Sequence, residues 1–95
     1  MRFEWDEPKR RSNLRDHGVD FMDAALIFEG VFLEAEDKRS DYGEPRFRAL
    51  GRVGDDYFMV AYTWRGDVRR IISAWRVDDD SKRRYEAILA RNAQG

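Results

Sequence analysis

The chain has 95 residues, of which 42% are hydrophobic and 14% aromatic, enough for one thin core, so we expect a single domain over residues 1–95. The absence of cysteine excludes a disulfide framework and thiolate metal chemistry, and one histidine argues against a histidine-based metal site. No segment approaches the roughly 18 apolar residues of a membrane span, and the N-terminus lacks a signal-peptide pattern, so we expect a cytoplasmic protein without a cofactor.

The charges are unevenly distributed along the chain. Residues 1–45 carry seven basic against twelve acidic side chains, whereas residues 46–76 carry seven arginines against three acidic side chains. Arginine makes up fifteen of the eighteen basic residues, and its planar guanidinium binds phosphate oxygens in pairs. This pattern indicates an anion-binding face on the second half of the chain, although a solvated surface explains the composition equally well.

The first half of the chain predicts one strand and two helices. Phe3 and Trp5 alternate with charged residues, which is typical of a strand. Asp6-Glu7-Pro8 then begins a helix that ends at His17-Gly18. Asp20 begins a second helix that ends at Gly30, and its apolar residues follow helical spacing: Phe21, Ala24, Ala25 and Phe28.

The second half predicts four strands, residues 31–36, 46–53, 57–64 and 68–76, and a helix that begins at Asp78–Ser81. The order is β-α-α-β-β-β-β-α, an α+β fold whose last three strands, joined by tight turns, are antiparallel neighbours. Two helices on one face of this antiparallel sheet would bury the following residues: Phe3, Trp5, Phe21, Phe28, Phe58 and Val60.

Strict alternation along the strands sorts the arginines into faces. It predicts one face for Arg46, Arg48 and Arg52, and places Arg70 and Arg76 together with Ile72 and Ala74. Ile71 shares the other face with the remaining polar and aromatic residues of that strand: Arg69, Ser73 and Trp75. Several guanidiniums, with Arg65 at the turn, could converge on a concave side beside rings that stack on bases: Tyr62, Trp64 and Trp75. A solvated face with cross-strand ion pairs fits the same alternation.

Two further groups are weighed for chemistry. His17 is the only side chain with an ordinary pKa near neutrality, and it could act as a general acid or base, or favour the end of its helix as a cap. Glu34 and Glu36 share one strand face, but no third ligand is patterned nearby, so solvation explains them better than a metal ion.

Several blocks of residues resemble the BrnT family of type II toxins. They are Trp5-Asp6, Lys9, Asn13, His17-Gly18-Val19, Phe21, Ala25 and Phe28, then Asp37, Arg39, Asp41-Tyr42-Gly43-Glu44 and Arg46, and finally Val60, Tyr62-Thr63, Arg65-Gly66, Arg70-Ile71-Ile72-Ser73-Ala74, Arg76 and Tyr85. The resemblance implies a RelE-like fold and a growth-slowing ribonuclease. It also implies a BrnA-type antitoxin with a ribbon-helix-helix domain, in a complex of two toxins and two antitoxins that touches DNA through the antitoxin.

One residue departs from the family pattern. The family usually continues Ser-Ala with two basic residues, and Trp75 occupies the first of these positions. Trp75 could stack on a base or fill the core beneath the last helix, and Ile71 and Ser73 on its predicted face favour the core.

A metal-free cleavage of RNA needs cations around the phosphate and groups that move protons. We expect Arg46, Arg65 and Arg70 to bind and stabilise the phosphate, with Arg76 nearby. The candidates for proton transfer are His17, Glu44 and Tyr62, and further RNA contacts are expected from Arg48, Tyr62 and Trp75. The alternatives are a non-catalytic module that binds RNA or protein, and an inactive toxin remnant that still binds its antitoxin.

Overall fold

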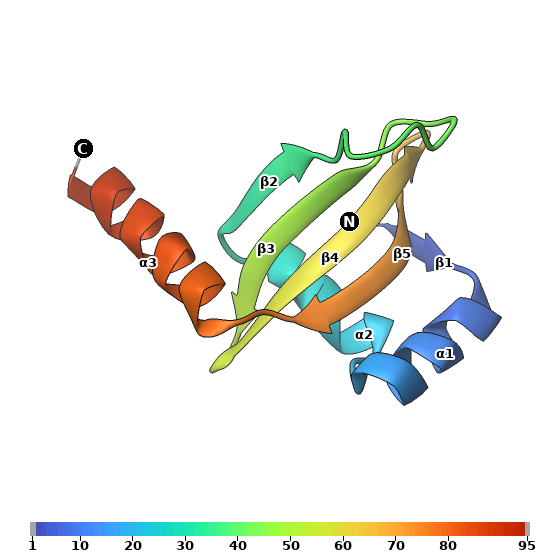
Figure 1. Ribbon diagram of the computed structural model, residues 1–95, viewed down its shortest axis with the longest axis horizontal. Coiled ribbons are helices and arrows are strands. Elements are labelled where there is room, and N and C mark those ends of the chain that lie inside the picture. The colour runs from blue at the N-terminus through green and yellow to red at the C-terminus, as the bar shows by residue number, and fades with distance from the viewer. Residues whose placement is uncertain (1, 95) are drawn as a thin grey trace.

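The computed structural model describes residues 2–94 and has the expected α+β order (Figure 1). The elements are β1 (Phe3–Trp5), α1 (Glu7–His17), α2 (Phe21–Ala24), the 3-10 helix η1 (Ala25–Glu29), β2 (Phe32–Glu36), β3 (Phe47–Val53), β4 (Asp56–Arg65), β5 (Val68–Arg76) and α3 (Asp79–Gln94). The predicted second helix is therefore an α-helical turn that tightens into a 3-10 helix, and the predicted strand 46–53 begins one residue later.

Within residues 2–94, the strands form one mixed sheet in the order β1-β5-β4-β3-β2. The pairs among β2 to β5 are antiparallel, as expected for strands that follow one another along the chain. β1 instead pairs with β5 in parallel, which the prediction of an antiparallel sheet did not include. No turn joins these two strands, so no hairpin geometry dictates their direction.

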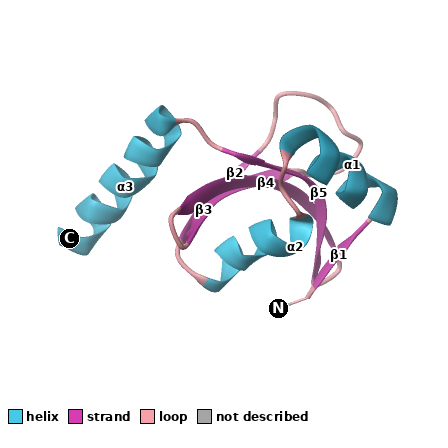
Figure 2. Cartoon of the chain, turned by 90° about the horizontal axis from the view of Figure 1, so that it is seen from below, coloured by secondary structure: helices cyan, strands magenta, loops and turns pink. Residues whose placement is uncertain are grey.

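The two faces of the sheet are covered differently. Figure 2, which views the sheet edge-on, shows the sheet curving around α2, with α1 beside the β5 edge, where Asn13 bonds the Ala74 backbone. We call the face that α2 covers the helix-covered face. The opposite face, here called the open face, is bordered at one end by α3 and at the other by the loop of residues 37–46 (Figures 1 and 2).

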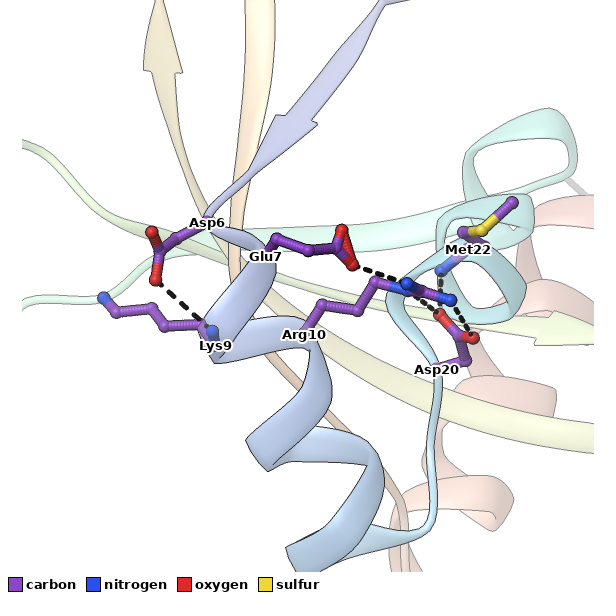
Figure 3. Close-up of polar contacts among 6 residues, drawn as sticks. All are labelled: Asp6, Glu7, Lys9, Arg10, Asp20 and Met22. Carbon is purple, nitrogen blue, oxygen red and sulfur yellow. Dashed lines mark hydrogen bonds and ion pairs between the residues drawn. The ribbon is translucent and has the colours of Figure 1, made fainter.

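Capping residues fix the two N-terminal helices, as Figure 3 shows. The Asp6 carboxylate accepts the backbone N–H of Lys9, and Gly18 ends α1 with a left-handed φ of 68°. Asp20 caps α2 by accepting the Met22 amide at 3.0 Å, and its two oxygens also accept Nε and Nη2 of Arg10 at 2.8 and 2.9 Å. Because Arg10 belongs to α1, this paired contact holds α1 against the start of α2 and lowers the pKa of Asp20.

The main core lies between the sheet and α2–η1. Its buried residues are Val19, Phe21, Ala24, Ala25, Ile27, Phe28, Ala49, Phe58, Val60, Tyr62, Ile71 and Ala74. The predicted Phe21, Phe28, Phe58 and Val60 are among them, and Phe3 and Trp5 pack against the cluster as partly buried residues. Gly51 allows η1 to approach closely, because a Cβ at that position would lie 2.6 Å from the Cβ of Ile27.

A smaller cluster anchors α3 on the open face. Tyr85 packs edge-on against Tyr57, with ring centroids 5.6 Å apart, and both are buried with Leu50. The Tyr85 hydroxyl also donates to the Val31 carbonyl at 2.7 Å. Asp78 caps the start of the helix by accepting the Ser81 amide at 2.8 Å. As a result, α3 covers only one end of the open face and leaves the strands near the 37–46 loop accessible.

Candidate functional site

The uncovered part of the open face carries four arginines. Arg70 pairs with Thr63 across β5 and β4, and Arg65 follows on the same face two residues after Thr63. Phe47, the first residue of β3, pairs with Tyr62, so Arg46 directly before it lies beside Thr63, and Arg48 lies two residues farther along the chain. Side chains opposite each other in a sheet are about 5 Å apart at Cβ, and i, i+2 neighbours about 7 Å. We call Arg46, Arg48, Arg65 and Arg70 the arginine cluster.

Two carboxylates lie within this cluster. Glu4, the register partner of Arg70 on β1, accepts Arg70 Nη1 at 2.5 Å. Glu44 lies 3.7 Å from Arg65 Nη2, and its side chain is 30% exposed. The four guanidiniums thus outnumber the neighbouring carboxylates by two, which leaves a net positive charge to bind an anion.

The 37–46 loop that supplies Glu44 and Arg46 is organised by Asp37. The Asp37 carboxylate is buried and accepts Nε and Nη2 of Arg39, both at 2.8 Å, as well as the Tyr42 hydroxyl at 3.2 Å. The Arg39 guanidinium holds the pKa of Asp37 well below its usual range. The loop closes where the Asp37 amide donates to the Arg46 carbonyl at 2.7 Å, and the Arg46 guanidinium lies 4.2 Å from the centre of the Tyr42 ring.

Some arginine donors of the cluster have no acceptor among the described residues. Nε of Arg46 and Nε of Arg48 are both buried without a hydrogen bond. Buried donors of this kind are rare in folded proteins, so the described residues do not fully satisfy these two guanidiniums.

A β-bulge in β5 overturns the predicted arrangement of Arg70 and Arg76. Ala61 pairs with Ser73, but its neighbour Tyr62 pairs with Ile71, so Ile72 is an extra residue in the strand. The bulge breaks the alternation, and the buried residues Ile71 and Ala74 face the same side. Arg70 therefore lies on the open face, whereas Arg76, which pairs with Phe58, lies on the helix-covered face.

The structure places His17 and Arg76 away from the arginine cluster. Arg76 Nη1 lies 3.5 Å from the carbonyl oxygen of Gly18, the residue that follows His17, and its Nε lies 3.8 Å from the Asp56 carboxylate. His17 is exposed and is the last residue of α1. Arg76 and the arginine cluster therefore lie on opposite faces of the sheet, and His17 forms no hydrogen bond or ion pair with the cluster among the described residues.

The aromatic residues Tyr62 and Trp75, both expected to contact RNA, lie on opposite faces of the sheet. Tyr62 is completely buried on the helix-covered face, where its hydroxyl donates to Glu34, so the expectation that its ring stacks on RNA is wrong for this structure. Burial raises the pKa of Tyr62 to about 12. Trp75 pairs with Met59 on the open face and is half-buried. Because of the bulge, Ile71 does not share its face, and this removes the argument that favoured a core position for Trp75.

Strand alternation grouped Arg69 with Ile71, and the structure confirms that both lie on one face, but the aromatic environment of Arg69 was not predicted. Its side chain is buried on the helix-covered face, with its guanidinium 4.1 Å from the ring centre of Phe28 and 4.6 Å from that of Trp64. Tyr62 and Phe32 complete this aromatic surround at 5.1 and 5.4 Å. The sequence signal for this position is the aromatic-rich strand β4 that pairs with Arg69, because cations pack favourably on aromatic faces.

Comparison with known protein families identifies the family to which the chain belongs. Residues 5–88 match the family described as the ribonuclease toxin BrnT of type II toxin–antitoxin systems. The chain belongs to this family. No curated protein matches the chain. The expected resemblance is thereby confirmed over most of the sequence, and membership of a type II system implies an antitoxin partner.

Among residues 2–94, no three His, Cys, Asp or Glu side chains gather in a way that could hold a metal ion. In the same part of the chain, no helix is both long and apolar enough to cross a membrane.

Proposed function

We propose that the open face is the RNA-cleaving surface of this BrnT-family toxin. The arrangement that carries the proposal is the arginine cluster with the Glu44 carboxylate beside Arg65. Arg46, Arg65 and Arg70 would bind the scissile phosphate and stabilise the charge that builds on it, and Arg48 would hold a neighbouring part of the strand. Placing three cations on one uncovered face suits a substrate that carries one negative charge per nucleotide.

The reaction that we propose needs no metal ion. The 2′-hydroxyl attacks the adjacent phosphorus, the bond from phosphorus to the 5′-oxygen breaks, and the products are a 2′,3′-cyclic phosphate and a 5′-hydroxyl. Glu44 accepts the proton of the 2′-hydroxyl, because it is the one proton-transfer candidate of the three that lies with the arginine cluster, and water protonates the leaving 5′-oxygen. Tyr62 lies on the other face, and His17 lies at the end of α1 next to Gly18, whose carbonyl oxygen is near Arg76.

Purified protein tests this assignment directly. We expect it to cleave single-stranded RNA in the presence of EDTA and to leave 2′,3′-cyclic ends. Substitution of Arg65 or Arg70 by alanine should slow cleavage by about 10²- to 10³-fold, the usual effect of losing one electrostatic contact to the transition state. If both variants cleave RNA at the wild-type rate and still arrest growth, the proposed site is wrong.

Growth assays distinguish the alternatives. Expression without the antitoxin should arrest growth, and the arrest should disappear in the Arg70→Ala variant. RNA binding without cleavage would identify a binding module, and normal growth together with antitoxin binding would identify an inactive toxin.

We also propose that the antitoxin is a BrnA-type protein with a ribbon-helix-helix domain, and that both act in the cytoplasm. The family match supports an antitoxin, and the resemblance of the sequence supports its type. Two toxins and two antitoxins would form the complex, and DNA would bind through the antitoxin. Light scattering of the co-expressed pair should give the mass of a 2:2 complex, and the toxin alone should not bind operator DNA.

A further inference from the structure

A pocket of about 320 Å³ lies on the open face beside the arginine cluster, between β3 and the first turns of α3. Its apolar surface comes from Leu33, Leu50 and Met59, and its polar groups are Arg48, Ser81 and Arg84. Glu34 also borders it, but the Glu34 carboxylate accepts the Tyr62 hydroxyl on the helix-covered face. The pocket therefore combines an apolar floor with two cations.

The floor continues into a row of apolar side chains across the sheet. Leu33 pairs with Leu50, Leu50 with Met59, and Met59 with Trp75, so these four residues lie side by side on the open face. Unstacked RNA bases bind to surfaces of this kind, because every base has an apolar face. The indole of Trp75 lies at the end of the row that is nearest β1.

The two arginines of the pocket form no direct ion pair, unlike the neighbouring basic residues of α3. On α3, Lys82 pairs with Asp79 and Arg83 with Asp80, whereas Arg84 forms no ion pair or hydrogen bond with any other residue in the described part of the chain. Arg48 likewise has no ion-pair partner among residues 2–94, and its Nε is buried without an acceptor. Arg84 interacts with Asp78 only at longer range, so neither guanidinium has a direct ion pair, and together they favour an anionic ligand at the pocket.

The spacing relates this pocket to the cleavage site. Arg48 lies two residues from Arg46 along β3, a distance of about 7 Å. That distance is similar to the separation of neighbouring phosphates in an extended RNA strand. A strand whose scissile phosphate lies at Arg46, Arg65 and Arg70 would therefore bring its next nucleotide to Arg48 and the apolar floor.

We propose that this pocket is a subsite for the next phosphate along the strand and for the nucleotide beyond it, with Arg48 and Arg84 holding that phosphate and the Leu33–Leu50–Met59 floor packing against that base. This inference rests on the proposed RNA-cleaving function of the open face. It adds the first turns of α3 to the substrate-binding surface, and it predicts that the protein gains affinity and rate from nucleotides beyond the cleaved bond.

The test compares RNA oligonucleotides of increasing length. Binding is measured with 2′-O-methyl oligonucleotides, which cannot be cleaved, and cleavage with a dinucleotide and with versions extended by one nucleotide on either side. For the wild type, one of the two extensions should increase both affinity and kcat/KM. The Arg84→Ala variant should lose most of this increase, by about five- to tenfold, and should cleave the unextended dinucleotide at the wild-type rate.

Arg83→Ala is the matched control, because it removes the same charge from the same helix but lies outside the pocket and is paired with Asp80. The inference is overturned if Arg84→Ala and Arg83→Ala respond equally to extension, or if Arg84→Ala weakens only antitoxin binding, which would assign the pocket to the protein partner. Loss of cleavage in Arg70→Ala with an unchanged extension effect in Arg84→Ala would leave the proposed function standing and reject the subsite alone. If the wild type binds none of the oligonucleotides, both proposals fail.

Discussion

The Asn13 side chain hydrogen-bonds both backbone groups of Ala74: its Nδ2 donates to the Ala74 carbonyl at 2.8 Å, and its Oδ1 accepts the Ala74 amide at 3.2 Å. The pairing of β5 with β1 ends at Ile71, so these groups have no strand neighbour on that side. Asn13 takes the place of the missing strand directly after the bulge. The Asn13 amide thereby stabilises the part of β5 that follows the bulge, and the bulge is what places Arg70 and Arg76 on opposite faces of the sheet.

The first prediction concerns this contact. Asn13→Ala leaves buried backbone groups without partners, including the Val19 carbonyl that Nδ2 also reaches at 2.9 Å, so the free energy of unfolding should fall by about 2 to 4 kcal/mol. Urea unfolding followed by circular dichroism measures this change. Ser12→Ala is the control, because the Ser12 hydroxyl donates only within α1, and it should alter stability by less than about 0.5 kcal/mol. Equal effects of the two substitutions would contradict the role given to Asn13.

The sequence predicted the elements of the fold well and the faces of β5 poorly. Turn residues, helix caps and periodicity gave the β-α-α-β-β-β-β-α order, because these signals are local. A bulge depends on how one strand pairs with the next, which local signals do not encode. Asn13, which bonds the strand after the bulge, is separated from Ala74 by 61 positions in the sequence. Strict alternation therefore grouped Arg76 with Arg70 and Trp75 with Ile71, although the bulge places the members of each pair on opposite faces. The family match supplied the ribonuclease activity that the strand pattern alone could not show, but it does not say which residues form the site.

The second prediction concerns the two faces of the sheet. Arg76→Ala and His17→Ala should retain RNA cleavage within a few-fold of the wild type, because Arg76 lies on the helix-covered face and His17 is next to Gly18, whose carbonyl oxygen is near Arg76. Arg70→Ala should be slower by about 10²-fold or more. Initial rates on one RNA substrate, measured for variants with unchanged circular dichroism, test the difference. A folded His17→Ala variant that no longer cleaves would show that the active site is not confined to the open face.

The third prediction concerns the ion pair between Glu4 and Arg70. Glu4→Gln removes a carboxylate that competes with phosphate for the Arg70 guanidinium at 2.5 Å, so affinity for a non-cleavable RNA should rise. Because both side chains are partly exposed, the expected gain is up to about fivefold, or 1 kcal/mol. Glu29→Gln removes the same charge at an exposed position of η1 and is the control for long-range electrostatics. A gain that is equal in both variants would mean that Glu4 acts only through net charge.

The fourth prediction concerns the buried hydroxyl of Tyr62. Its pKa of about 12 lies above the ordinary value of 10.0, so the folded state holds this proton more tightly than the unfolded state does. The resulting stability is complete below pH 10 and is lost as the pH rises to about 12, because only the unfolded tyrosine ionises in that interval. Urea unfolding at a series of alkaline pH values should show a steeper loss for the wild type than for Tyr62→Phe. Parallel curves for the two proteins would contradict the raised pKa.

The last prediction concerns Asp37 and the loop that carries Glu44 and Arg46. The pKa of Asp37 is lowered by Arg39, so the carboxylate stabilises the loop above the ordinary value of 3.8, and this contribution is lost as the pH falls below it. Asp37→Asn should reproduce the loss at neutral pH, with faster hydrogen exchange of the loop amides and slower RNA cleavage. Asp41→Asn is the control, since it makes the same change in the same loop at an exposed carboxylate that accepts only the Gly43 amide. If the loop amides exchange equally slowly in both variants, Asp37 does not hold the loop in place, and the positions of Glu44 and Arg46 must depend on other contacts, such as the hydrogen bond from Thr63 to the Pro45 carbonyl.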